Sequence, residues 1–214
     1  MRWFRGSEAE QSKATVKAGG GQRTNRRSTG FAEFTRALPG YSNLSVLDLG
    51  PTSSANIAFL TGFGGRVHNE DILRASQDNS YKRRQENGTD LLDPDQFFAD
   101  NLNYPEQSFD AILCWDIPDF LHESLVKPMV DRIQRILKPG GILLAFFHTK
   151  DAGPDSCYCR YHIVSGEVLD LESRSEFRLQ RVFNNRHIEN LFKGFSSLKF
   201  FLARDNIREV LAVR

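Results

Sequence analysis

The chain has 214 residues, of which 40% are hydrophobic, so it can bury the core of one domain. A formal net charge of +1 excludes attachment to nucleic acid or a membrane surface by bulk electrostatics alone. Cys114, Cys157 and Cys159 are too few, and odd in number, for a disulfide framework, so we expect a cytoplasmic protein. Apolar runs of about 18 residues and an apolar N-terminal core are both missing, which argues against a transmembrane segment and a secretory signal.

Residues 1–28 differ from the rest of the chain. Between Arg2 and Arg27 there are seven basic and two acidic residues, and apolar residues are almost absent after Phe4. Such a segment cannot bury enough apolar surface to offset its ordering entropy. We therefore expect a flexible basic tail over residues 1–28, followed by one domain over residues 29–214. The alternatives are a basic arm that contacts RNA, an acidic partner or a membrane face, and a lid over a ligand.

The first periodic segments predict a helix, a strand and a second helix. Apolar residues at helical spacing predict a short helix over residues 30–38. The run Leu44 to Leu49 predicts a buried strand, and Gly50 allows a tight turn after it. Ser53 or Ser54 can then cap the following helix, whose free N–H groups can face a charged small molecule.

A second, weaker strand over residues 66–69 completes a βαβ unit and ends at Glu70 and Asp71. Asp71 lies 21 positions after Gly50, which is close to the separation that places an acid against a ribose. A nicotinamide dinucleotide fits poorly, because the turn lacks the glycines that a pyrophosphate requires.

The next patterns predict a polar helix face and loop over residues 74–92, a helix from Asp93-Pro94 and a buried strand from Phe109 to Trp115. A helix from Lys127, with Pro128 in its first turn, and a strand from Ile142 to Phe147 follow. The last patterns predict an extended pair from Tyr158 to Leu171, a helix through Ile188 and Phe195, and a hairpin of 198–203 with 209–213. Alternating strands and helices indicate an α/β fold. We expect a Rossmann-like, doubly wound, mostly parallel sheet with a C-terminal antiparallel hairpin, in three αβα layers.

Three motifs resemble those of class I S-adenosylmethionine-dependent methyltransferases. Val46-Leu47-Asp48-Leu49-Gly50 resembles the first motif of that family, and Ser108-Phe109-Asp110-Ala111-Ile112 resembles the entry to its fourth strand. Leu137-Lys138-Pro139-Gly140-Gly141 resembles the turn before its fifth strand. The resemblance extends over about residues 44–147, and the three motifs occur in the family's order.

The resemblance implies S-adenosylmethionine as cofactor, held by residues in the positions of the family's motifs. Asp48 and Gly50 would lie by the methionine part, Asp71 or Glu70 would take the ribose hydroxyls, Asp100-Asn101 would stand near the adenine, and Trp115-Asp116 would edge the cofactor and face the substrate. Pro51 and Thr52 belong to the same turn. Thr52 and Ser54 depart from the family, which places glycines there.

Methyl transfer is an in-line displacement, and it requires a general base only where the acceptor is protonated. Asp116, Asp119 and His148 are candidates near the carboxyl edge of the sheet, and none is assigned. We expect no metal, because the Cys157-x-Cys159 spacing is explained by alternating strand residues.

Two functions are consistent with the sequence. The first is a class I methyltransferase acting on an unidentified acceptor, with a small molecule favoured and RNA or protein retained through the basic tail. The second is a non-catalytic methyltransferase-like protein that binds a protein or RNA partner. The departures at Thr52 and Ser54 favour the second function, and the acids at Asp48 and Asp71 favour the first.

Overall fold

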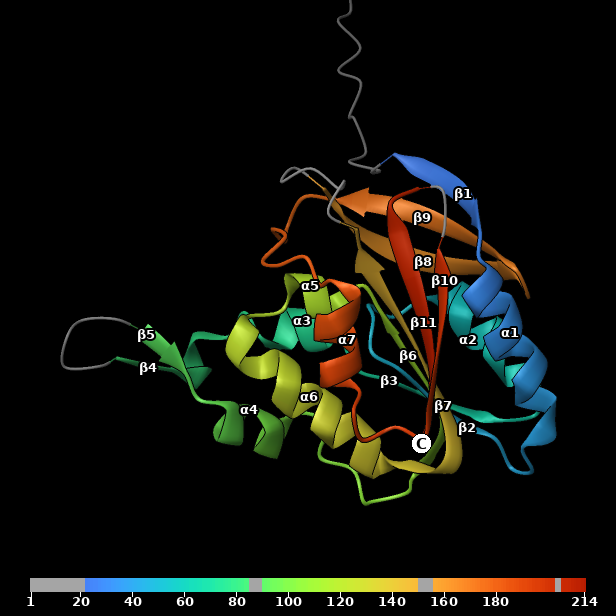
Figure 1. Ribbon diagram of the computed structural model, residues 1–214, viewed down its shortest axis with the longest axis horizontal. Helices are drawn as coiled ribbons and strands as arrows, with labels where there is room; N and C mark the ends of the chain where they lie inside the picture. Colours follow the sequence, from blue (N-terminus) through green and yellow to red (C-terminus); the bar gives the residue numbers. More distant parts are fainter. Residues whose placement is uncertain (1–21, 85–89, 150–155, 203–204) are drawn as a thin grey trace, which may run out of the picture.

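The computed structural model describes residues 22–84, 90–149, 156–202 and 205–214. Its centre is a six-stranded sheet with the order β10-β11-β7-β6-β2-β3 (Figure 1). The strands are β10 (Ser197–Leu202), β11 (Ile207–Val213), β7 (Leu137–His148), β6 (Phe109–Trp115), β2 (Ser45–Asp48) and β3 (Arg66–Asn69). The strands β7, β6, β2 and β3 are parallel, and β11 runs antiparallel to both of its neighbours, β7 and β10. The expected α/β fold with its C-terminal hairpin is confirmed.

Helices cover both faces of this sheet and bury a core on each side. On one face lie α1 (Thr29–Ala37) and α2 (Ser54–Thr61), and on the other lie α3 (Ile72–Ala75), α4 (Pro94–Asp100), α5 (Ile117–Phe120), α6 (Glu123–Ile136) and α7 (Asn185–Leu191). Two 3-10 turns, η1 (Leu38–Gly40) and η2 (Asn79–Tyr81), complete the set of helices. The side chains of β6 alternate between the two cores, with Ile112 in one and Leu113 in the other. The result is the three-layer αβα arrangement.

Three helix expectations differ from the structure. The helix α7, expected through Phe195, ends at Leu191. The helix α6 begins at Glu123, capped by the His122 ring, so Pro128 lies inside the helix and not in its first turn. The segment expected to be a polar helix and loop contains a small hairpin of β4 (Lys82–Arg84) and β5 (Asp90–Leu92). No helix in the described parts of the chain is long and apolar enough to cross a membrane.

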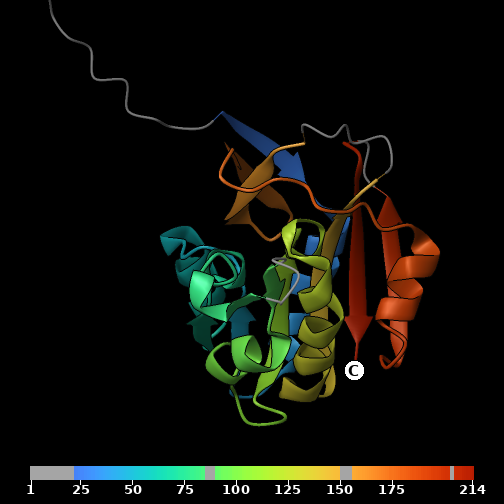
Figure 2. The ribbon, with the colours of Figure 1, turned by 90° about the vertical axis from the view of Figure 1, so that its left-hand side faces the viewer.

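A second sheet, of three antiparallel strands, lies at the end of the molecule where β7 terminates (Figures 1 and 2). Its order is β1 (Arg23–Arg27), β9 (Val168–Arg174) and β8 (Tyr158–Ser165). The pair around Ser165 and Gly166 was expected, but β1 was not.

The expected flexible tail over residues 1–28 therefore does not hold for residues 23–28. Arg26 is buried and paired with Glu209, and Ser28 caps α1 by accepting a hydrogen bond from the Phe31 N–H. An arginine-rich strand is accommodated because its one inward side chain meets a buried acid. Residues 1–21, the rest of that segment, lie outside the described residues.

Candidate functional site

Gly50 lies directly after β2, and the Trp115 indole packs against its open face. A Cβ at position 50 would lie 2.8 Å from Trp115 Cδ1, so only glycine fits. Trp115 has a φ of 50°, an uncommon conformation for a bulky residue, and its ring stacks on Tyr161 with centroids 4.9 Å apart. The Gly50 carbonyl accepts a hydrogen bond from Asn69 Nδ2 at 2.8 Å. The Trp115 indole therefore occupies the space beside the Gly50 backbone where the sequence predicts a ligand.

Asp48 is buried at the end of β2, and protein groups use both of its carboxylate oxygens. Oδ1 accepts from Trp115 Nε1 at 2.7 Å and from the Gly50 N–H at 3.0 Å, and Oδ2 accepts from Asn56 Nδ2 at 3.0 Å. Burial raises the pKa of this carboxyl, against the effect of the three hydrogen bonds. In this arrangement Asp48 ties β2, β6 and α2 together.

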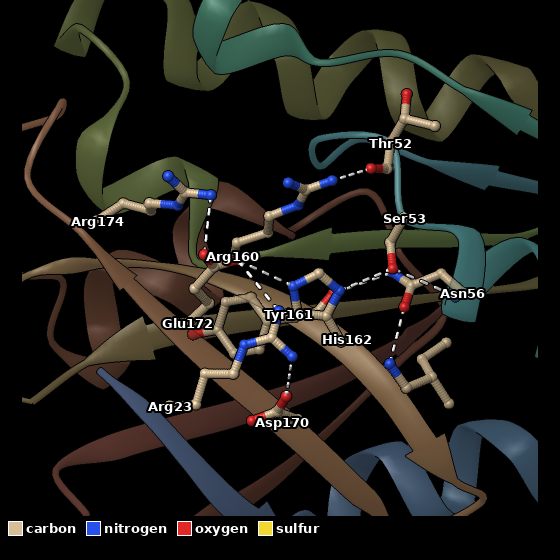
Figure 3. Close-up of polar contacts among 11 residues, drawn as sticks. Arg23, Thr52, Ser53, Asn56, Arg160, Tyr161, His162, Asp170, Glu172 and Arg174 are labelled. Carbon is tan, nitrogen blue, oxygen red and sulfur yellow. Dashed lines mark hydrogen bonds and ion pairs between the residues drawn. The ribbon is translucent and has the colours of Figure 1, made fainter. Parts of the chain in front are cut away.

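The strand β8 closes over the start of α2 (Figure 3). Ser53 caps the helix through its Oγ, which also lies 2.9 Å from His162 Nδ1. Asn56 Oδ1 accepts from the Ile163 N–H at 2.8 Å, and the Arg160 guanidinium donates to the Thr52 carbonyl. Thr52 and Ser53 therefore hold the three-stranded sheet against the helix.

The two acids that follow β3 have different surroundings. Glu70 Oε1 accepts from the Leu102 N–H at 2.7 Å, which turns this carboxylate toward the loop after α4. Asp71 caps α3 by accepting from the Arg74 N–H at 3.1 Å, and burial raises its pKa. Asp71 thus keeps acceptor capacity for a ligand.

Asp71 lines a cavity of about 500 Å³ beside Pro51, which we call the Pro51 cavity. Its walls are Pro51, Asp71, Arg74, Gln77, Arg160, Arg174, Glu176 and Phe177. They come from the turn after β2, from α3 and the residues that flank it, from the strands β8 and β9, and from the loop after β9. The cavity therefore lies at the carboxyl edge of the sheet, where ligands of doubly wound folds bind.

Asp100 and Asn101, the residues expected near an adenine, lie at the end of α4. Asp100 accepts from Gln96 Nε2 at 3.0 Å on the helix surface, and Asn101 Nδ2 donates to the Phe97 carbonyl at 2.9 Å. Neither residue lines the Pro51 cavity.

The three candidate bases do lie together. Asp119 Oδ2 accepts from the His148 N–H at 2.5 Å and lies 2.8 Å from His148 Nδ1. Burial would lower the pKa of His148, but the hydrogen bond to Asp119 and the charges of Asp116 and Asp119 outweigh it and raise the pKa. Burial raises the pKa of Asp116 to about 7, and Tyr161 Oη donates to its Oδ2 at 3.1 Å.

Beside this cluster is a cavity of about 760 Å³ that we call the Arg26 cavity. Arg26, His148, Cys159, Tyr161, Phe201 and Glu209 are among its walls. Buried Arg26 Nη1 has no hydrogen-bond partner among the described residues. The cavity thus combines apolar and aromatic walls with a few polar groups, as small-molecule sites do.

Among the described residues no group of three or more His, Cys, Asp or Glu side chains is placed to hold an ion. His148 points to Asp119, and His162 is engaged with Ser53 and Glu172.

Sequence patterns did not identify the residues that close the site. Asn56 and Asn69 give no pattern of their own, and Arg160 and Tyr161 lie in a stretch that indicates only a strand pair. Because side chains alternate along a strand, Arg160 and Tyr161 are expected on opposite faces of it. Nothing in the sequence indicates which elements the strand contacts.

Comparisons with known proteins agree with this fold. Residues 47–145 match a family model described as a methyltransferase domain. No curated protein matches the chain. The PH0226 protein of Pyrococcus horikoshii is 14% identical, with a TM-score of 0.51 over 86% of this chain and 88% of that one.

Two further solved structures have lower TM-scores. A SAM-dependent methyltransferase of Aquifex aeolicus is 12% identical, with a TM-score of 0.48 over 86% of this chain and 88% of that one. The 1,6-didemethyltoxoflavin-N1-methyltransferase of Burkholderia thailandensis is 15% identical, with a TM-score of 0.47 over 87% and 78%.

Proposed function

We propose that this chain, whose residues 47–145 match a methyltransferase-domain model, is a class I S-adenosylmethionine-dependent methyltransferase that transfers the methyl group of its cofactor to a small molecule. The cofactor is S-adenosylmethionine, and we assign it to the Pro51 cavity. We assign the acceptor to the Arg26 cavity. Tyr161 and His148 line the Arg26 cavity, and Asp116 accepts a hydrogen bond from Tyr161 Oη.

The observation that carries this proposal is the Asp71 carboxylate in the wall of the Pro51 cavity. A carboxylate can accept from both ribose hydroxyls, and such charge-assisted bonds are worth about 1.5–3 kcal/mol. Phe177 and Gln77, in the same walls, offer an apolar face and an amide for a base. The residues present therefore fit the nucleoside half of the cofactor.

The cofactor supplies an electrophilic methyl group on a sulfonium. The protein's share of the chemistry is to align the acceptor, exclude water and take a proton where the acceptor carries one. His148 is suited to accept this proton. Its Nδ1 is held by Asp119, its Nε2 is the second ring nitrogen, and the residue lines the Arg26 cavity. Its raised pKa means that His148 accepts a proton only at pH values above its ordinary range.

The size of the Arg26 cavity supports a small-molecule acceptor. A volume of about 760 Å³ falls inside the range of about 300–1,000 Å³ that holds drug-sized ligands. The cavity is bounded by two sheets, so a folded macromolecule could reach it only through an inserted side chain or base.

Calorimetric titration of S-adenosylhomocysteine into the purified protein tests the cofactor assignment. The informative variant is Asp71→Asn, because asparagine retains the helix cap of α3 while it removes the charge. We expect at least about tenfold weaker binding, from the loss of charged hydrogen bonds to the ribose. The matched control is Asp95→Asn, an exposed position on α4, which should leave the affinity unchanged.

An unchanged affinity in Asp71→Asn would contradict the ribose assignment. If the folded wild-type protein gives no heat with S-adenosylhomocysteine or S-adenosylmethionine at tens of micromolar protein, the enzyme assignment fails. The non-catalytic, partner-binding alternative would then stand.

A further inference from the structure

The Pro51 cavity carries charges of both signs. Arg74, Arg160 and Arg174 provide the positive charges in its walls, and Asp71 and Glu176 provide the negative ones. The amino-acid end of S-adenosylmethionine is a zwitterion, so a mixed set of charges suits it better than charges of one sign. The ion pairs of the three arginines show which of them is free to bind an anionic group.

Strand register brings two of these arginines to one face of the three-stranded sheet. Arg160 of β8 is directly opposite Glu172 of β9, and Arg174 lies two residues further along β9. Residues two apart share a face, so both guanidinium groups project on the same side. Figure 3 shows the two side chains leaving their strands on this side, with the Arg160 guanidinium by Thr52.

The three arginines differ in how they are partnered. Arg174 is paired with Glu172, with Nη2 and Oε1 2.9 Å apart. Arg74 is exposed on the surface of α3. Arg160 is half-buried and, within the described chain, has no acidic partner within salt-bridge distance. Among the described residues, its buried Nε has no hydrogen-bond partner, and its guanidinium donates to the carbonyl of Thr52 alone.

The other place where a methionine chain could lie is closed. Trp115 fills the space over Gly50, and Asn69 occupies the Gly50 carbonyl. Asp48 is fully engaged within the protein. A cofactor whose ribose is held by Asp71 must therefore extend its amino-acid end along the outer side of Pro51, toward β8.

We propose that Arg160 binds the α-carboxylate of the methionine moiety of S-adenosylmethionine. The inference rests on the proposed function, because it assumes that the cofactor occupies the Pro51 cavity. A half-buried guanidinium without an acidic partner gains a charge-assisted hydrogen bond when a carboxylate arrives. The Thr52 carbonyl keeps the guanidinium in place before the ligand binds.

Comparing the affinities of two ligands distinguishes the contribution of Arg160 from that of the rest of the site. S-adenosylhomocysteine carries the amino-acid end, whereas 5′-methylthioadenosine has the same nucleoside and sulfur without it. Calorimetric titrations with both ligands should be run on the wild type, Arg160→Gln and Arg160→Lys. Arg74→Gln removes another arginine of the same cavity and is the competing variant, and the matched control is Arg186→Gln, on the exposed surface of α7 and outside the Pro51 cavity.

For Arg160→Gln we expect about tenfold to hundredfold weaker binding of S-adenosylhomocysteine and unchanged binding of 5′-methylthioadenosine. Unchanged binding of the second ligand also shows that the variant is folded. Arg160→Lys should recover part of the loss, because it retains the charge, and Arg186→Gln should leave both affinities unchanged.

The contact to Arg160 is refuted if Arg160→Gln weakens both ligands equally, or if Arg74→Gln gives the selective loss instead. In either case the proposed function stands, because both ligands still bind the wild type. If neither ligand binds the folded wild type, the proposed function and this inference fail together.

Discussion

Asn56 makes the set of hydrogen bonds that holds β8 onto the central fold. Its Nδ2 donates to Asp48 Oδ2 at 3.0 Å and to the Tyr161 carbonyl at 3.1 Å, and its Oδ1 accepts from the Ile163 N–H at 2.8 Å. Asn56 is 1% exposed, so water cannot replace these partners. Asn56→Ala therefore leaves a carboxylate oxygen, a carbonyl and an N–H buried without a partner.

Each orphaned buried group costs about 1–3 kcal/mol, so the three together should lower the free energy of unfolding by about 3–9 kcal/mol. That is a large share of the about 5–15 kcal/mol that stabilises a typical domain. At about 2–4 °C per kcal/mol for a chain of this size, Tm should fall by about 6 °C or more. Urea unfolding followed by circular dichroism measures the loss.

The matched control is Asn190→Ala on the exposed surface of α7, which should change stability by less than about 0.5 kcal/mol. If Asn56→Ala stays within about 1 kcal/mol of the wild type, the three bonds do not hold the two sheets together, and our structural interpretation of Asp48 is wrong.

Two further predictions concern buried charges. Glu209→Leu should destabilise the protein by about 3–5 kcal/mol, because Arg26 is left in the interior without its main partner. Adding Arg26→Met to this variant should recover part of the lost stability. If urea unfolding shows that the effects of the two substitutions are strictly additive, the two residues do not form a stabilising pair. His148 has a raised pKa, so its ion pair with Asp119 contributes stability that is complete below about pH 6.5 and is lost as pH rises through the folded value. Asp116, with a pKa of about 7 in the folded state, acts in the same direction. Unfolding free energies should therefore be higher at about pH 6 than at about pH 8.5, and His148→Gln should reduce that difference; an identical pH dependence in the variant would rule out this assignment.

The central βαβ unit could be predicted from the sequence because its signals are local. The apolar run to Leu49, the glycine at position 50 and the cap at Ser53 each specify their own conformation. The same holds for Asp93-Pro94, where the cap and the proline place the start of α4 correctly. Pro128 misled the prediction because proline favours the first turn, whereas the apolar stripe of α6 begins earlier, at Leu125.

Long-range pairings explain what the sequence did not show. Arg26 lies in a segment with the composition of a disordered tail, and its burial depends on Glu209, which is 183 residues away. Nothing near either residue indicates the pair. The polar strand β1 is stabilised by this contact and by the edge of β9.

The candidate site was predicted by motif position, and the structure distributes those residues over different tasks. Asp71 lines the Pro51 cavity, as a ribose ligand would require, and Asp116, Asp119 and His148 come together as a group. Asp48 instead binds Trp115, Gly50 and Asn56. A buried acid requires a polar partner, which can be a ligand or a side chain, and the sequence does not show which of the two it is.

The position of the nucleoside tests the central claim most directly, and a crystal structure of the complex with S-adenosylhomocysteine measures it. We predict density for the nucleoside beside Pro51, with the ribose hydroxyls within hydrogen-bond distance of the Asp71 carboxylate. A ribose bound in the Arg26 cavity, or held by Glu70 with Asp71 facing solvent, would contradict this assignment.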